Sequence, residues 1–289
     1  MMDVRLSTQA APDRITNEDG VLAIGALVAV FDGVTQPSTV DSGCSHGPAW
    51  YVRRLAARLA LAYADAPEDP LPDLLAHAIG DVADEHRATC DLTRPATPAS
   101  TVCMLREGRD HIDYLVLCDS TLVLDCGERT TAVTDNRIHQ VIARTRPETV
   151  AGSEATVKPV TVAKWRHTNQ RDGYWIAAAN PQAAHHSVTG RAPLSGPDRV
   201  RRAALLTDGA AAAVDQFRLF DWAGLLDALA SSGPAKLIGR IRSAEAAAVL
   251  DDARLRYKRY DDATAAICLF EDTDRRLLRP HVRRDITGP

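Results

Sequence analysis

Residues 25–33 read Gly-Ala-Leu-Val-Ala-Val-Phe-Asp-Gly, a short apolar run that stops abruptly at Asp32-Gly33. This pattern predicts a buried strand that enters a turn. An aspartate directly after an apolar strand is unfavourable unless the fold needs a carboxylate there, because burying an ionised oxygen without compensation costs several kcal/mol. Such a group pairs, takes up a proton or binds a metal ion.

Similar acidic signatures lie along most of the chain, each at a predicted strand end or tight turn. Carboxylates without accompanying His or Cys favour hard divalent cations such as Mg²⁺ or Mn²⁺. The pattern therefore predicts a metal-dependent phosphate-ester hydrolase. The further signatures are Arg-Ile-Thr-Asn-Glu-Asp at 14–19, Asp119-Ser120, Asp208-Gly209 and Asp261-Asp262-Ala263-Thr264.

Composition is that of an ordinary soluble globular protein, with 289 residues, 45% hydrophobic and 25% charged. No apolar run approaches the roughly 20 residues that span a bilayer, and the N-terminus lacks a signal-peptide pattern. We therefore expect a cytoplasmic protein with no membrane partner. The net charge of -4 also gives no basic footprint for nucleic acid, so we expect no nucleic-acid partner.

Six cysteines and nine histidines are present, without a Cys-x-x-Cys pair. Cys103, Cys118 and Cys268 lie inside apolar runs, which is typical of small buried thiols. A zinc site needs Cys and His at tight spacing, and we read the sequence as lacking it. The sequence therefore predicts neither a disulfide framework nor a zinc site.

Hydrophobic periodicity divides the rest of the chain into helices and short strands. The order is a strand, two helices, several strands, two helices and a final strand, which does not fit alternating βαβ units. The predicted helices are 50–63, 74–86, 137–144, 217–230 and 235–255, and the predicted strands after 25–31 are 100–105, 114–118, 121–126, 174–179, 203–207 and 264–270.

This order predicts an α+β fold, a four-layer α-β-β-α sandwich of two antiparallel sheets flanked by pairs of helices. We expect one domain over residues 1–289, with a core at about 14–270. The polar and irregular segment at about 147–193 is a candidate flap or insert. A basic C-terminal tail at about 272–289 is expected to be loose.

The motifs, taken in order, resemble the metal-dependent protein phosphatase 2C family, also called PPM. They read Arg-x-x-x-Glu-Asp, Asp-Gly, Ser-Thr, Asp-Ser, Asp-Gly and Asp-Asp-x-Thr, and they run from Arg14 to about Phe270. The resemblance is to a divergent, bacterial-type member. It implies a central β-sandwich with helix pairs outside it, and two Mn²⁺ or Mg²⁺ ions, with a third in some cases, at one end.

The resemblance also implies the metal ligands. Asp32 is expected to bridge the two ions, and the carbonyl of Gly33 to reach one of them directly or through water. Glu18 is expected to bind one ion, and Asp208 and Asp261 the other. Two ions roughly 3.5–4 Å apart activate a water for in-line attack on phosphorus, so no covalent intermediate is required.

Five further residues take supporting roles by the same resemblance. Arg14 matches the arginine that holds the substrate phosphate, which suits its planar and permanently charged fork. Asp119 matches an aspartate at a third, more weakly bound metal. Asp19, Thr101 and Asp262 are expected to support the ligands by hydrogen bonding and packing.

The sequence departs from the family pattern at several positions. Val34 stands where some members carry a histidine proposed as general acid, so another group would protonate the leaving oxygen. Ala212, four residues after Asp208, replaces a third-metal carboxylate, and Asp215 is an alternative for it. Asp262 stands where asparagine is common, a change that we expect to be tolerated.

Three functions remain open from the sequence. The leading one is a protein serine/threonine phosphatase whose partner is a phosphorylated protein. The second keeps the chemistry but acts on a small phosphorylated metabolite, since the loop after Gly33 and the candidate flap are the kind of segments that set specificity. The third is a phosphatase-like regulatory or binding module with weak turnover, motivated by Ala212. Within the flap, Trp165, Arg166 and His167 are candidate substrate contacts.

Overall fold

The computed structural model describes residues 2–36, 40–127, 129–145, 164–248 and 260–271. The strands form two five-stranded antiparallel sheets. The first sheet has the order β1 (Asp3–Gln9), β10 (Ala263–Leu269), β9 (Arg202–Leu206), β6 (Thr121–Asp125) and β7 (Thr130–Thr134). The second has the order β2 (Gly20–Ile24), β3 (Leu27–Gly33), β4 (Ser100–Glu107), β5 (His111–Leu117) and β8 (Val188–Pro193).

The apolar run at residues 25–33 contains β3, which is buried on both faces. Because side chains alternate along a strand, Val28 and Val30 pack between the two sheets, whereas Ala29 and Phe31 pack against the helices outside. The inter-sheet layer also contains Cys103 and Cys268, which are fully buried free thiols as predicted.

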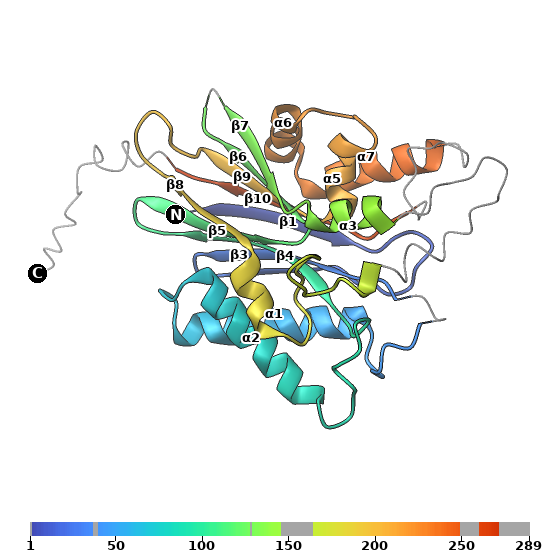
Figure 1. Cartoon of the computed structure of the whole chain (residues 1–289). Coiled ribbons are helices and arrows are strands. Elements are labelled where there is room, and N and C mark those ends of the chain that lie inside the picture. Colours follow the sequence, from blue (N-terminus) through green and yellow to red (C-terminus); the bar gives the residue numbers. More distant parts are fainter. Residues whose placement is uncertain (1, 37–39, 128, 146–163, 249–259, 272–289) are drawn as a thin grey trace, which may run out of the picture.

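Helices cover the outer faces of both sheets (Figure 1). Helices α1 (Pro48–Asp65) and α2 (Leu71–His86) pack on the second sheet, and α5 (Asp208–Asp215), α6 (Trp222–Ser232) and α7 (Pro234–Ala247) pack on the first. Short helices α3 (Arg137–Thr145) and η1 (Pro181–His186) lie beside the sandwich. The predicted α+β four-layer α-β-β-α sandwich is thus confirmed, with three helices rather than a pair on the first sheet.

Several predicted elements differ from the structure. Residues 174–179 are not a strand, since they form only two isolated bridges, Tyr174 with Thr168 and Ala177 with Ser100. The segment 188–193, predicted as part of a flap, is instead the edge strand β8 and pairs with β5. The rest of the predicted flap up to 163, and the predicted tail at 272–289, lie outside the described residues.

The strand ends that carry the acidic signatures all meet at one end of the sandwich. Antiparallel pairing places the end of β3 beside the start of β4, and the end of β9 beside the starts of β6 and β10. The start of β10 in turn lies beside the end of β1. The loops that follow or precede these ends therefore share one edge, although they are far apart in the sequence.

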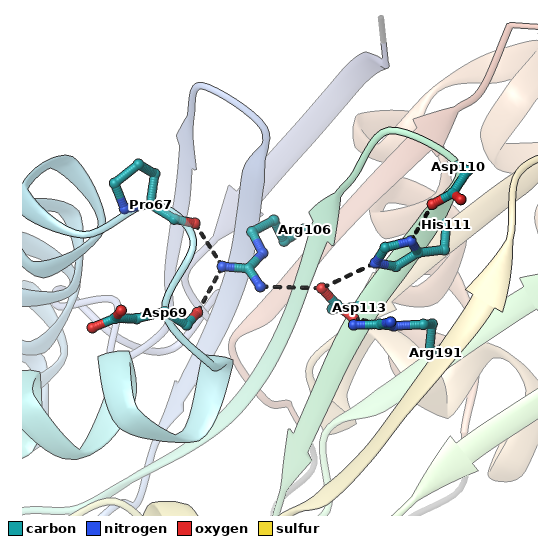
Figure 2. A network of polar contacts seen from close by, with 7 residues as sticks. All are labelled: Pro67, Asp69, Arg106, Asp110, His111, Asp113 and Arg191. Carbon is teal, nitrogen blue, oxygen red and sulfur yellow. Dashed lines mark hydrogen bonds and ion pairs between the residues drawn. The ribbon is translucent and has the colours of Figure 1, made fainter.

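The opposite end of the second sheet is held by an ionic network (Figure 2). Asp113 on β5 accepts hydrogen bonds from its cross-strand neighbours Arg106 (3.1 Å) and Arg191 (2.9 Å). Arg106 also donates to the carbonyl oxygens of Pro67 and Asp69 in the α1–α2 connection, at 2.6 and 2.7 Å. This network fastens the helical layer to the sheet, away from the acidic loops.

Among the described residues, we find no helix with the length and apolar character needed to traverse a lipid bilayer.

Candidate metal centre

Asp32 is the penultimate residue of β3 and lies opposite Thr101 of β4. Burial raises the pKa of Asp32 well above its ordinary value, and repulsion from Asp208, Asp19, Asp261 and Asp119 raises it further. Carboxylates from five separate segments, belonging to both sheets, are therefore within electrostatic reach of one another. Such a convergence of negative charge is destabilising in itself, and it is typical of a functional site.

Asp19 is held deep in this end by two threonines. Its carboxylate accepts a hydrogen bond from the Thr207 hydroxyl at 2.9 Å, and that hydroxyl accepts one from the backbone N–H of Thr264 at 2.9 Å. Burial raises the pKa of Asp19 well above its usual range, whereas the Thr264 and Thr207 hydrogen bonds oppose the rise. The sequence analysis did not identify Thr207, which fixes Asp19 at the end of β9.

Asp262 fastens the loop that carries Glu18. The Asp262 side chain is 4% exposed, and its two oxygens accept the backbone N–H groups of Ala11 and Glu18, each at 2.7 Å. The carbonyl of Glu18 in turn accepts the N–H of Gly33 at 3.1 Å. A Cβ on Gly33 would lie 2.5 Å from that carbonyl oxygen, so the close approach of the two loops requires glycine.

Arg14 lies beside Glu18 and therefore near the carboxylates. A residue that binds the substrate phosphate has to lie close to this site. Its guanidinium donates to the Glu18 carboxylate at 2.7 Å and to the Thr35 hydroxyl at 3.1 Å. Thr35 itself donates to Glu18 at 2.6 Å. The segment after Gly33 thus contributes a residue to the site that the sequence analysis missed, because a lone threonine in a polar loop carries no distinctive signal.

Asp119 occupies the turn between β5 and β6. The preceding residue, Cys118, has a left-handed backbone (φ 65°). Residues other than glycine adopt this conformation at an energetic cost, and here it reverses the chain at the turn. His139 Nε2 on α3 lies 3.5 Å from the Asp119 carboxylate. Thr101 is buried, and its hydroxyl is 2.5 Å from that of Ser120, so it joins β4 to this turn as a supporting residue.

Asp215, the alternative to the carboxylate missing at Ala212, lies on the same helix as Asp208. It is the last residue of α5, which begins at Asp208, and seven helical residues advance the chain by about 10 Å. Ala212 itself is buried.

Helix α5 was not predicted. Its first turn packs closely on the Asp262 segment, since a Cβ on Gly209 would lie 2.0 Å from the Asp262 carbonyl oxygen.

Two neighbouring histidines lie outside the acidic loops and have separate partners. The ring of His186 stacks on Trp175 with a centroid distance of 3.6 Å, and His185 Nδ1 is 3.7 Å from Asp73. Trp165 is buried and lines a small cavity together with Val34. Trp165 thus packs beside the segment after Gly33, and its contact with substrate stays a prediction.

The donor set at the acidic end fits hard divalent cations, because it offers carboxylate oxygens. In the described part of the chain, no three of the converging carboxylates have ligand oxygens all within 4.8 Å of one another. Among the described residues, one group of three or more Cys, His, Asp or Glu has ligand atoms all within 4.8 Å of one another, and it is a different one: Cys44, His46, His86 and Cys90. The sequence predicted no zinc site because tight spacing of Cys and His was required, whereas the structure brings two short pairs together across the fold.

No family model matches the sequence, and no curated protein matches it significantly. Solved structures do match the fold. The catalytic domain of the serine/threonine phosphatase PstP in complex with two manganese ions is 17% identical, with 93% of this chain and 97% of that chain covered and a TM-score of 0.56. The PPM Ser-Thr phosphatase MsPP from Mycobacterium smegmatis in complex with cacodylate is 19% identical, with 93% and 98% covered and a TM-score of 0.53.

The serine/threonine phosphatase Stp1 from Staphylococcus aureus is 13% identical, with 94% of this chain and 96% of that chain covered and a TM-score of 0.57. All three likenesses extend over nearly the full length of both proteins. The chain therefore has the fold of the PPM-type serine/threonine phosphatases.

Proposed function

We propose that the protein is a metal-dependent phosphomonoester hydrolase that removes phosphate from serine and threonine residues of proteins. The observation that carries the proposal is the convergence of four carboxylates from separate segments on Asp32. Burial raises the pKa of Asp32, and these carboxylates raise it further. Within the fold of PPM-type phosphatases, this convergence lies where the strand ends of both sheets meet. A module without catalytic activity has no need for so much opposed negative charge.

In this proposal Asp32, the Gly33 carbonyl, Glu18, Asp208 and Asp261 hold two Mn²⁺ or Mg²⁺ ions. Bound divalent cations neutralise the carboxylates, activate a water and stabilise the charge that spreads over the phosphoryl oxygens. The match to PstP, which was solved with two manganese ions, supports this choice of metal. Asp119 is proposed to serve a weaker third ion.

The remaining residues of the chain position the ligands and the substrate. Asp262 holds the backbone of Glu18, and Thr207 holds Asp19. Arg14 carries the positive charge next to the carboxylates, and its hydrogen bonds to Glu18 and Thr35 orient the guanidinium at the edge of the site. We propose that it binds two phosphate oxygens of the substrate, as a planar fork does best.

The test is phosphate release by purified protein with Mn²⁺, offered phosphopeptides, p-nitrophenyl phosphate and a panel of phosphorylated metabolites. We expect release from phosphopeptides, and a loss of more than about 100-fold in kcat/KM for Asp208→Asn, because removing even a supporting partner of a ligand costs 10–100-fold. Asp65→Asn, an exposed aspartate at the end of α1, is the matched control and should keep full activity.

Each alternative has its own result in this assay. Preference for one metabolite over every phosphopeptide would replace the protein substrate by a small molecule. Release from none of the substrates, with Mn²⁺ still bound, would reject the enzyme and leave a binding module.

A further inference from the structure

Two short sequence pairs meet beside the N-terminus of α1, at a site distinct from the acidic loops. Cys44 and His46 belong to the segment that leads into α1, whereas His86 ends α2 and Cys90 lies in the turn that follows. The Sγ atom of Cys44 is 3.5 Å from Nδ1 of both His46 and His86. The Sγ atom of Cys90 is 3.4 Å from Nδ1 of His46.

These separations are those of ligands around a tetrahedral zinc ion. With Zn–S of about 2.3 Å and Zn–N of about 2.05 Å, the tetrahedral angle places sulfur and nitrogen about 3.6 Å apart. Two thiolates and two imidazoles form a common structural zinc set, whereas Mg²⁺ and Mn²⁺ prefer oxygen. We propose that Cys44, His46, His86 and Cys90 bind one Zn²⁺ ion.

The backbone brings the two pairs together independently of any side-chain hydrogen bond. The carbonyl of Gly43 accepts the N–H of Asp91 at 2.8 Å, which joins the two segments directly next to their ligands. Gly43 has a left-handed backbone (φ +68°), and a Cβ there would lie 2.5 Å from Arg94 Cγ and 2.7 Å from the Asp91 carbonyl oxygen. Only glycine permits this approach, so the local sequence is suited to bring the ligands together.

Hydrogen bonds and ring stacking also fix the orientation of the four proposed ligands. The Cys90 N–H donates to the His86 carbonyl at 2.9 Å, so this pair, four residues apart, stays on one side of the helix end. The N–H of His46 donates to the Cys44 sulfur at 3.4 Å. The Trp50 ring stacks on His46 with a centroid distance of 4.1 Å, and it lies 5.0 Å from His86. These contacts restrain both imidazoles.

A disulfide between Cys44 and Cys90 is the principal rival explanation. Both cysteines are free in the structure. A disulfide would also give no role to His46 and His86, whose Nδ1 atoms point at the sulfurs. Four soft or borderline ligands at tetrahedral spacing are explained by a single cation, and zinc uptake would release a proton for each thiol still protonated.

The proposed ion is structural, because four protein ligands leave no open coordination position. It would fasten the connection between β3 and α1 to the end of α2. This connection starts at the acidic site, where Thr35 contacts Glu18 at 2.6 Å. Zinc would therefore hold in place the far end of the segment whose near end borders the proposed metal centre.

Two measurements test this site without reference to activity. Zinc content is measured by mass spectrometry after gel filtration for the wild type, the double variant Cys44→Ser/Cys90→Ser, and Cys126→Ser. Cys126 is a half-buried free cysteine outside the cluster and is the matched control. We expect one equivalent of zinc in the wild type and in Cys126→Ser, and its loss in the double variant.

The second measurement does not depend on the folding of a variant. Wild-type protein stripped of zinc and loaded with Co²⁺ should show a thiolate-to-cobalt charge-transfer band and the intense visible bands of tetrahedral cobalt. A zinc-free wild type with reduced thiols that gives no such spectrum would overturn the proposal. So would zinc retained by the double variant, or a Cys44–Cys90 disulfide found by non-reducing mass spectrometry.

Discussion

Asp262→Asn is a small chemical change that the structure predicts to be harmful in this chain. Both carboxylate oxygens of Asp262 accept buried backbone N–H groups, from Ala11 and from Glu18, at 2.7 Å. An asparagine has one acceptor oxygen, and its amide N–H groups cannot accept. One of the two backbone donors is therefore left without a partner, in a position where the side chain is 4% exposed.

The magnitude follows from the cost of that donor. A buried donor left unsatisfied costs about 1–3 kcal/mol. Removing the charge also relieves repulsion, since Asp262 is one of the groups that raise the pKa of Asp19. We therefore expect Asp262→Asn to lower the free energy of unfolding by about 1–2 kcal/mol, and Asp262→Ala, which abandons both donors, by about 3–5 kcal/mol.

Urea denaturation of the metal-free protein measures this directly, with Asp65→Asn as an exposed control. A loss of 1 kcal/mol corresponds to a fall in Tm of about 2–4 °C for a domain of this size, so thermal unfolding gives a second readout. An unfolding free energy for Asp262→Asn within about 0.5 kcal/mol of wild type would refute the reasoning. That result would restore the sequence-based expectation that Asp and Asn are interchangeable at this position.

Two further changes test the fold and the site. Thr207→Val removes the buried hydroxyl between Asp19 and the Thr264 N–H, and should lower the unfolding free energy, measured in urea, by about 2–3 kcal/mol. The control Thr131→Val, on β7, should change it by less than about 0.5 kcal/mol. Equal effects of the two substitutions would contradict the assigned network. Partial burial raises the pKa of Asp113, but hydrogen bonds from two arginines outweigh it and lower the pKa. A carboxylate with a lowered folded pKa stabilises the protein above its unfolded pKa of about 3.9, and the contribution is lost as the pH falls through the folded pKa. Asp113→Asn should therefore cost about 1–2 kcal/mol at pH 7 and progressively less below about pH 4, and a cost that is constant with pH would contradict the ionic account.

The sequence predicted those elements whose apolar pattern is strong. Strand β3 is buried on both faces, and α1 and α2 bury a continuous stripe, so each stands out from its neighbours. The edge strands β1 and β8 were missed because most of their side chains are exposed or half-buried, and backbone pairing rather than apolar burial defines them. Helix α5 was missed because Asp208-Gly209 resembles a turn, whereas the structure places it in the first helical turn.

Some residues of the candidate sites could be predicted from the sequence, and others could not. Carboxylates after apolar strands are conspicuous, so Asp32 and Asp208 could be identified from the sequence. Thr207 and Thr35, which donate hydrogen bonds to Asp19 and Glu18, could not, because a hydroxyl gains its partner only from the folded arrangement. The pair Cys44-x-His46 was detectable, but its partners His86 and Cys90 lie on another element, and tight spacing within one segment was the wrong criterion.

A crystal of the protein soaked in Mn²⁺ and measured at the manganese absorption edge would show where the cations lie. We expect two anomalous peaks among Glu18, Asp32, Asp208 and Asp261, with the Gly33 carbonyl facing one of them, and no manganese at the Cys44 cluster. Saturating Mn²⁺ that leaves these four carboxylates without a peak would contradict the proposal that they bind catalytic cations.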